Sequence, residues 1–126
     1  MLEWTDPPFS AGHWVPDLVT AGGGGPVLAN PGGDSHRLPW DAVTAAGAEV
    51  VIVAPCGFHL DPTIELAKEL VATDRLPPAA EVWAVDADAF FVRPGPRVVD
   101  GAELVGQILH PDLCGLPPDD RAARLR

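Results

Sequence analysis

The sequence has little positive charge. Eight Lys and Arg residues stand against 18 Asp and Glu residues, which gives a formal net charge of −10. Nucleic acids and anionic membrane surfaces would be repelled by such a chain, so neither is an expected partner. No apolar run approaches the roughly 20 residues that span a bilayer. Met1 is followed by Glu3 and Asp6 rather than by a basic segment and an apolar run, so we expect a cytoplasmic protein.

Metal-binding patterns and paired cysteines are also missing. The 4 histidines are scattered, with no two placed four residues apart, and no CxxC occurs. The sequence therefore predicts no metal site and requires no cofactor. The 2 cysteines, Cys56 and Cys114, lie far apart in the chain. In a reducing compartment we expect both to be free thiols.

What the sequence does contain is a short apolar run, Val50–Ala54, which ends in Pro55-Cys56-Gly57-Phe58. Its length and β-branched residues predict a strand over 49–54 that is covered on both faces. Glu81–Val85 predicts a second strand, and Met1–Trp4 predicts the end of another. In open α/β sheets, ligands bind beyond the carboxyl ends of the strands. The turn through Phe58 is therefore a candidate place for a site.

Helical patterns alternate with these strands. They predict helices over His13–Ala21, Trp40–Ala46, Asp61–Thr73 and Val98–Leu109. Such alternation predicts an α/β fold: a three-layer sandwich with a small, mostly parallel sheet and helices on both faces. Residues 1–112 are expected to form this single unit.

The remaining segments are expected to be less regular. Val27–Ala29 is a candidate for a short strand. Asp6–Gly12 is predicted to be a stiff loop because Pro7 and Pro8 fix the backbone. Residues 86–96 are predicted to be irregular, and residues 113–126 to form a polar, loosely held tail.

Two groups of residues could carry catalysis. Cys56 at the strand end would be a nucleophile if His59 acted as its base, although a small residue facing the core or a ligand is the favoured reading. Asp86 and Asp88 follow the second strand as a pair of carboxylates. Such pairs can tune each other for acid–base work, but more often these residues cap turns.

Six aromatic residues lie in or beside the loops. Taken singly, each is more often a core residue; taken together, they could line one shallow apolar wall for a flat ligand. They are Phe9, Trp14, Trp40, Phe58, Phe90 and Phe91.

Several motifs resemble one known family. Glu3–Phe9 with Gly12-His13-Trp14, Pro39-Trp40, Pro55–Phe58 and Phe90–Arg97 continuing into Val99-Asp100-Gly101 occur in family order over residues 1–112. In this stretch the chain resembles the C-terminal lobe of the cobalamin-binding substrate-binding proteins of ABC importers.

The resemblance implies one lobe of a type III periplasmic-binding fold, with a corrinoid as the possible ligand. It implies a ligand wall made by Phe9 and Trp40 and by the loop before the last helix, with Cys56 to Phe58 facing the same cleft. The expected ligand-binding residues are therefore Phe9, His13, Trp14, Trp40, Cys56, Gly57, Phe58, Asp88, Phe90, Phe91 and Arg93.

The chain departs from the family in two respects. It spans only one lobe, and Ala46 stands where the family docks its transporter through an acidic residue. The first hypothesis is therefore a freestanding half that binds a large flat molecule, corrinoid-like or aromatic, without transporter docking. A homodimer or a separate second lobe would complete the cleft.

Two alternatives stay open. The first is a small cofactor-independent biosynthetic enzyme, such as a Pictet–Spengler-type cyclase, with Asp88 or Asp86 as the acid or base and Cys56 or His59 in reserve. The second is a module that binds another protein through the exposed apolar wall.

Overall fold

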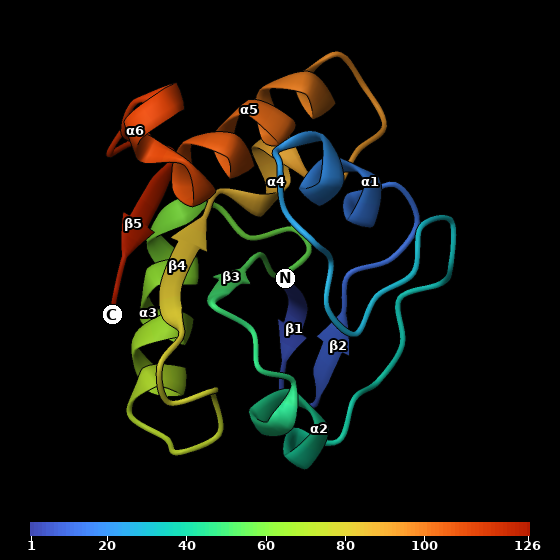
Figure 1. The fold of residues 1–126 in the computed structure, drawn as a ribbon, viewed down its shortest axis with the longest axis vertical. Helices are drawn as coiled ribbons and strands as arrows, with labels where there is room; N and C mark the ends of the chain where they lie inside the picture. Colours follow the sequence, from blue (N-terminus) through green and yellow to red (C-terminus); the bar gives the residue numbers. More distant parts are fainter.

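The protein is built on one five-stranded sheet with helices on both faces (Figure 1). The computed structural model describes all residues, 1–126. The sheet has the order β2-β1-β3-β4-β5. Its strands are β1 (Leu2–Thr5), β2 (Pro8–Ser10), β3 (Val50–Val53), β4 (Glu81–Val85) and β5 (Ala122–Arg124). The central strands β1, β3 and β4 are parallel, and both edge strands run antiparallel to their neighbours. The predicted α/β sandwich is confirmed, with a mixed sheet.

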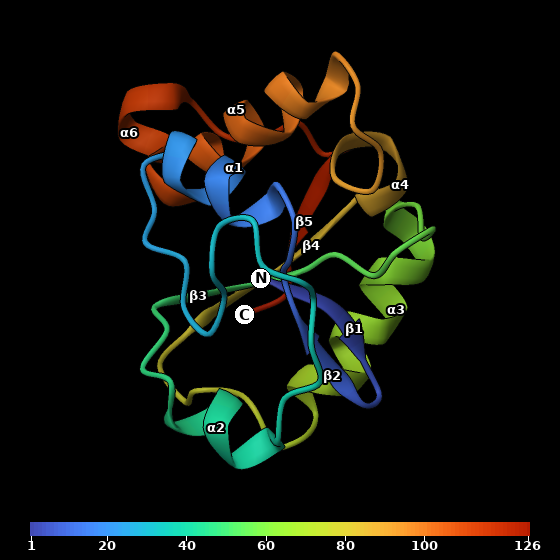
Figure 2. The same ribbon diagram turned by 90° about the vertical axis from the view of Figure 1, so that its right-hand side faces the viewer.

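The helices form the two outer layers, which Figure 2 shows from the side. One layer contains α1 (Val15–Ala21), α4 (Ala87–Phe90) and α5 (Arg97–Leu109). The other contains α2 (Trp40–Ala45) and α3 (Leu60–Val71). The short helix α6 (Pro111–Cys114) packs against α5. The longest helix has 13 residues, and no helix combines the length and apolar character needed to cross a bilayer.

The apolar run of β3 supplies both sides of the core. Val51 and Val53 belong to the cluster beneath α2 and α3. Ile52 and Ala54 belong to the cluster beneath α1 and α5. Successive side chains of a strand point to opposite faces, so a strand covered on both faces needs an apolar residue at every position. This is why β3 shows a continuous run rather than an alternating pattern.

The helix predictions are confirmed with shifted ends. His13 and Trp14 precede α1 rather than opening it. The long helix begins at Leu60, so Asp61 lies in its first turn and is not its N-cap. The N-cap residue is His59, whose carbonyl oxygen accepts a hydrogen bond of 2.7 Å from the Thr63 hydroxyl. Cys56 and Cys114 are both free thiols.

Three local predictions near the loops are wrong. Residues 8–10 form the edge strand β2 instead of a loop, since a proline is tolerated on an edge strand. Val27–Ala29 forms no strand, and Leu28 adopts a positive φ of 57°, which is incompatible with one. The segment after β4 contains α4, because the Asp86 carboxylate caps it by accepting a hydrogen bond of 2.9 Å from the Ala89 N–H.

The prediction of a loosely held tail over 113–126 is also wrong. Ala122–Arg124 pairs antiparallel with β4 and closes that side of the sheet. Ala122 is buried at 3% exposure within the core under α5. The Arg126 guanidinium donates to the carbonyl oxygens of Ala80 and Pro77 at 3.0 and 2.7 Å. The C-terminal residues therefore hold the edge of the sheet in place.

This arrangement predicts that Ala122→Asp strongly destabilises the protein. A carboxylate would be buried beside β4 with no partner, which should lower the free energy of unfolding by about 2–4 kcal/mol. Chemical denaturation followed by circular dichroism measures the change. Leu113→Asp is the matched control, because Leu113 is 86% exposed, and it should stay within about 0.5 kcal/mol of the parent. Equal stabilities of the two variants would mean that the terminal strand contributes nothing.

Candidate functional site

Two loops meet at the carboxyl ends of the parallel strands. The first follows β3 and runs through Cys56 and Phe58 to His59 at the start of α3. The second follows β4 and begins with Asp86 at the cap of α4. The Asp88 N–H donates a hydrogen bond of 3.1 Å to the Phe58 carbonyl oxygen, which fixes the two loops against each other. Parallel strands thus bring together residues that are about thirty positions apart in the chain.

A charged cluster lies where these loops meet. The His59 Nδ1 is 3.2 Å from both carboxylate oxygens of Asp86. Its Nε2 is 3.9 Å from Asp88 Oδ2. The Arg93 guanidinium donates to Asp88 Oδ1 at 3.3 Å. The structure therefore gathers three of the four residues predicted as catalytic, and adds Arg93 from the predicted ligand-binding set.

The geometry of this cluster suits proton transfer at an open surface. The His59 side chain is 69% exposed, whereas those of Asp86 and Asp88 are 17% and 24% exposed. Asp86 is held by the α4 backbone through its capping bond, so it can orient the imidazole as well as cap the helix. A histidine oriented by one carboxylate and facing another can receive a proton on one nitrogen and release it from the other.

A second group of predicted residues lines a small cavity beside this cluster. Its volume is about 300 Å³, and its walls include His13, Trp14, Cys56 and Phe91. The Trp14 indole N–H donates a hydrogen bond of 3.0 Å to the Phe91 carbonyl oxygen. This bond joins the start of α1 to the end of α4, so the cavity is closed by segments far apart in sequence.

His13 is held in an unusual backbone conformation. Its φ is 56°, in the left-handed region that residues other than glycine rarely adopt. Its N–H donates to the Gly33 carbonyl at 2.7 Å, and its own carbonyl accepts from the Gly32 N–H at 3.0 Å. The loop around Gly32 and Gly33 thus holds the backbone of His13, and the His13 ring lies 5.9 Å from the ring of Trp14. Strain of this kind is concentrated at ligand sites.

Cys56 is placed in the cavity but is poorly suited to act as a nucleophile. The residue as a whole is exposed, yet its thiol is partly desolvated. This burial, together with the nearby negative charge of Glu3, raises the pKa of the Cys56 thiol. A nucleophilic cysteine needs the opposite environment, because the thiolate is the reactive form. The arrangement favours a role for Cys56 as part of the cavity wall.

The six predicted wall aromatics do not share one cavity. Trp14 and Phe91 line the small cavity with Cys56. The Phe90 ring lies under the Arg121 guanidinium at 5.3 Å, on the side of β5. The Trp40 ring lies under the Arg75 guanidinium at 5.4 Å and borders a separate hollow beside Pro7 and Pro8.

The hairpin of β1 and β2 separates these groups of aromatic residues. Phe9 lies in β2, half-buried, with its Cα level with that of Trp4. Trp4 was not among the predicted site residues, although it is exposed at 37% and meets the Phe58 ring edge to face at 5.5 Å. A large aromatic residue next to the Asp6-Pro7-Pro8 turn was the signal that could have identified it.

Glu3 is the other residue that the sequence did not single out. Its Oε1 accepts a hydrogen bond of 3.0 Å from the Gly12 N–H, and its side chain lines the cavity beside Cys56. Gly12 itself has no room for a side chain, because a Cβ would collide with the backbone of Ser35. The loop before α1 is therefore fixed from two sides at this site.

Comparisons with family models, with curated proteins and with solved structures found no match for the chain. The resemblance to the cobalamin-binding lobe therefore stays a prediction from the sequence motifs. The structure shows no group of three or more His, Cys, Asp or Glu side chains placed to hold a metal ion.

The environment of Cys56 predicts slow alkylation at neutral pH. In a Cys114→Ser background Cys56 is the sole thiol, and its rate of reaction with iodoacetamide should reach half its maximum at a higher pH than a cysteine in a short peptide. Glu3→Gln should move this midpoint to lower pH, since it removes the negative charge while keeping an oxygen that can accept from Gly12. A midpoint at or below the peptide value would show an activated thiol.

Proposed function

We propose that the carboxyl edge of the sheet binds a large, flat small molecule, a corrinoid or another extended aromatic ligand. The observation that carries this proposal is the pair of aromatic rings formed by the exposed Trp4 and the half-buried Phe58, at the same edge as the charged cluster around Asp88. A flat ligand could stack on the rings while its polar periphery bonds to His59 and Arg93.

One wall of this kind leaves the other face of the ligand open to water. A second copy of the chain, placed face to face, would cover it and rebuild a two-walled cleft. The exposed Trp4 ring would then be buried by the ligand and the partner copy together. The proposed form is a cytoplasmic homodimer that closes on its ligand, with no role for a transporter.

Titration with cyanocobalamin should quench the tryptophan emission, because a bound corrinoid absorbs light at the emission wavelength of nearby indoles. Phe58→Ala should weaken binding, measured by equilibrium dialysis of the coloured ligand, by about three- to tenfold, because it removes one aromatic stacking partner. Leu113→Ala is the matched control, since Leu113 is 86% exposed and lies on α6. No quenching beyond that of free tryptophan amide, or equal loss in both variants, would contradict the proposal.

A second candidate function is supported by the His59 geometry. An imidazole held between two carboxylates is suited to moving a proton for an electron-rich aromatic substrate. In a Pictet–Spengler-type reaction, an arylethylamine and an aldehyde lose water to form an iminium ion. The ring carbon then bonds to the iminium carbon, and the displaced ring proton passes to Asp88. The pair Asp86 and His59 would hold or relay that proton.

If this second function is correct, Asp88→Asn should lower the turnover of an arylethylamine–aldehyde pair by about 10²–10⁴-fold, because the base is lost. Asp119→Asn changes an exposed carboxylate of the C-terminal segment and should leave turnover unchanged. Product formation is followed by liquid chromatography, with circular dichroism to confirm that both variants fold. Full activity in the Asp88→Asn variant would exclude the role.

A further inference from the structure

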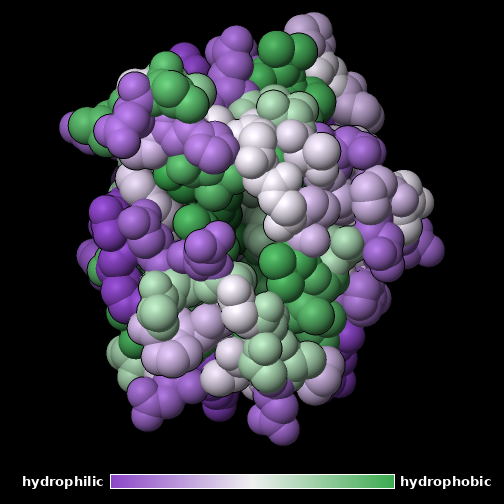
Figure 3. Space-filling model, viewed as in Figure 1, coloured by the Kyte–Doolittle hydropathy of each residue, from purple (hydrophilic) through white to green (hydrophobic).

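A cavity with a mostly apolar lining lies at the opposite end of β3 from the proposed site. It has a volume of about 460 Å³, within the range of about 300–1,000 Å³ typical of ligand pockets. The hydropathy surface in Figure 3 shows apolar side chains around a hollow near the middle of the viewed face. The cavity is bordered by the start of β3, by the coil of Gly23–Leu28 and by the end of α5. It contains none of the residues predicted from the sequence as ligand-binding or catalytic.

The cavity adjoins an open strand edge. The pairing of β1 with β3 joins only Leu2 with Val53. On its other side β3 pairs with β4 along its whole length, from Val50 to Val53. This parallel pairing takes in the Ile52 carbonyl and the Ala54 N–H, so the Ile52 N–H and both backbone groups of Val50 are left without a strand neighbour on the β1 side. No loop or turn supplies a backbone hydrogen bond to Val50 or Ile52.

The register shows which backbone groups face the cavity. In β3 the Ala54 N–H donates to Leu2 of β1, whereas the Glu49 carbonyl accepts from Glu81 at the start of β4. Alternate residues of a strand direct their backbone groups to opposite neighbours. Both backbone groups of Val50 and the Ile52 N–H thus point away from β4, toward the cavity. Ile52 is buried, at 4% exposure, and a buried backbone N–H requires a hydrogen-bonding partner.

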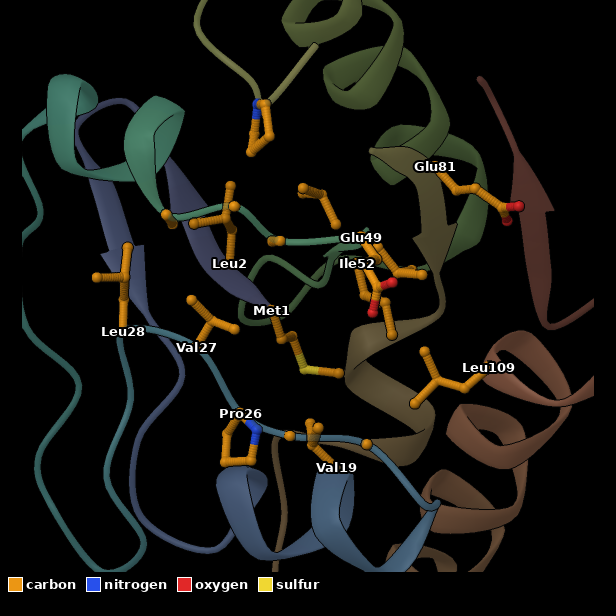
Figure 4. Close-up of a pocket in the computed structure, with 18 of the residues that line it drawn as sticks. Met1, Leu2, Val19, Pro26, Val27, Leu28, Glu49, Ile52, Glu81 and Leu109 are labelled. Atoms are coloured by element: carbon orange, nitrogen blue, oxygen red, sulfur yellow. The ribbon is translucent and has the colours of Figure 1, made fainter. Parts of the chain in front are cut away.

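The walls of the cavity belong to both helical layers. Leu2 and Val43 come from the core beneath α2 and α3, and Ile52 comes from the core beneath α5. Figure 4 shows Val27 approaching from the coil after α1 and Leu109 from α5. The cavity therefore lies in the plane of the sheet, between its two faces. An occupant would be covered on both sides, as a central strand is.

We propose that this cavity binds an extended apolar peptide of a partner protein, which adds to the open edge of β3 as a parallel strand in line with β1. The main chain of the peptide would supply the missing partners of the Ile52 N–H and of both Val50 backbone groups, and consecutive apolar side chains would fill the space on both faces. The Met1 side chain, which extends into the cavity in Figure 4, is a flexible thioether that can repack against the peptide.

Charge favours a basic residue at the amino end of the peptide. A parallel strand would place its amino end level with the start of β3, where the exposed Glu49 borders the cavity. Glu81 also borders it but is engaged by Arg124 at 3.1 Å. Glu49 is paired with no cation in the structure, and the whole chain carries a net charge of −10. A lysine ahead of the apolar residues would therefore meet complementary charge.

The test uses acetyl-Lys-Lys-Val-Ile-Val-Val-amide and the full chain labelled with ¹⁵N. On titration, the amide resonances of Val50 and Ile52 should shift downfield, because these groups gain hydrogen-bond partners. Those of Val51 and Val53, which face β4, should move less. Absence of binding up to roughly 1 mM peptide would overturn the proposal.

Backbone methylation of the peptide separates strand addition from general apolar binding. Methylating the amide nitrogen of the fourth residue blocks one edge of the peptide, and methylating that of the fifth blocks the other edge. One of the two peptides should lose about tenfold or more in affinity, while its neighbour should keep most of it. Equal affinities for both methylated peptides would show only an apolar cavity and would overturn strand addition.

A matched pair of chain variants locates the peptide. Val27 and Val99 are both exposed, at 41% and 62%, but only Val27 borders the cavity. Val27→Asn should weaken peptide binding by about threefold or more, since it removes apolar contact, and Val99→Asn should leave it unchanged. Glu49→Gln should weaken the lysine-containing peptide more than a version with glutamines in place of the lysines. Equal effects of the two valine variants would place the peptide elsewhere.

Discussion

The burial of β3 between two helical layers is the constraint on which the rest of the structure depends. Val51 and Val53 face one layer, and Ile52 and Ala54 face the other. None of these four positions can therefore carry a polar side chain without burying it. Polar side chains that could take part in binding or catalysis therefore lie at the two ends of β3, where the chain leaves the sheet. The charged cluster follows the carboxyl end, and the open edge with Glu49 lies at the amino end.

At the carboxyl end, one carboxylate serves both the fold and the candidate site. Asp86 caps α4 through the Ala89 N–H and also holds the His59 ring. The cap keeps the carboxylate in one orientation, so the histidine is oriented by a group that the fold has already fixed. Asp88 has no such capping bond and faces the exposed Arg93, which leaves it free to exchange partners with a ligand. Although Asp86 and Asp88 are close together in the sequence, their carboxylates thus have different environments.

The sequence was sufficient to predict those elements whose pattern is local. The apolar run of β3 and the periodic helices α3 and α5 follow from residue spacing alone. The edge strands escaped prediction because their stability comes from a neighbour: Ala122–Arg124 is short and has no β-branched residue, and only its pairing with β4 makes it a strand. For the same reason the sequence identified His59, Asp86 and Asp88 individually but not their contact. The aromatic wall was divided by β2, because a hairpin stands where a loop was expected.

The two ends of β3 differ in how completely they are paired, and this separates the two proposed sites. Val53 is the only residue of β3 that is paired with both neighbouring strands, with Leu2 of β1 on one side and with β4 on the other. Beyond it, toward Cys56, the Glu3 carbonyl still accepts from the Cys56 N–H at 3.2 Å, so the carboxyl-end loops stand on three connected strands. Before it, toward Glu49, both backbone groups of Val50 and the Ile52 N–H have no partner on the β1 side. A peptide that added there would extend the sheet without displacing any backbone bond of the carboxyl end. Binding at one end therefore requires no rearrangement at the other, and each site can be altered and measured while the other stays intact.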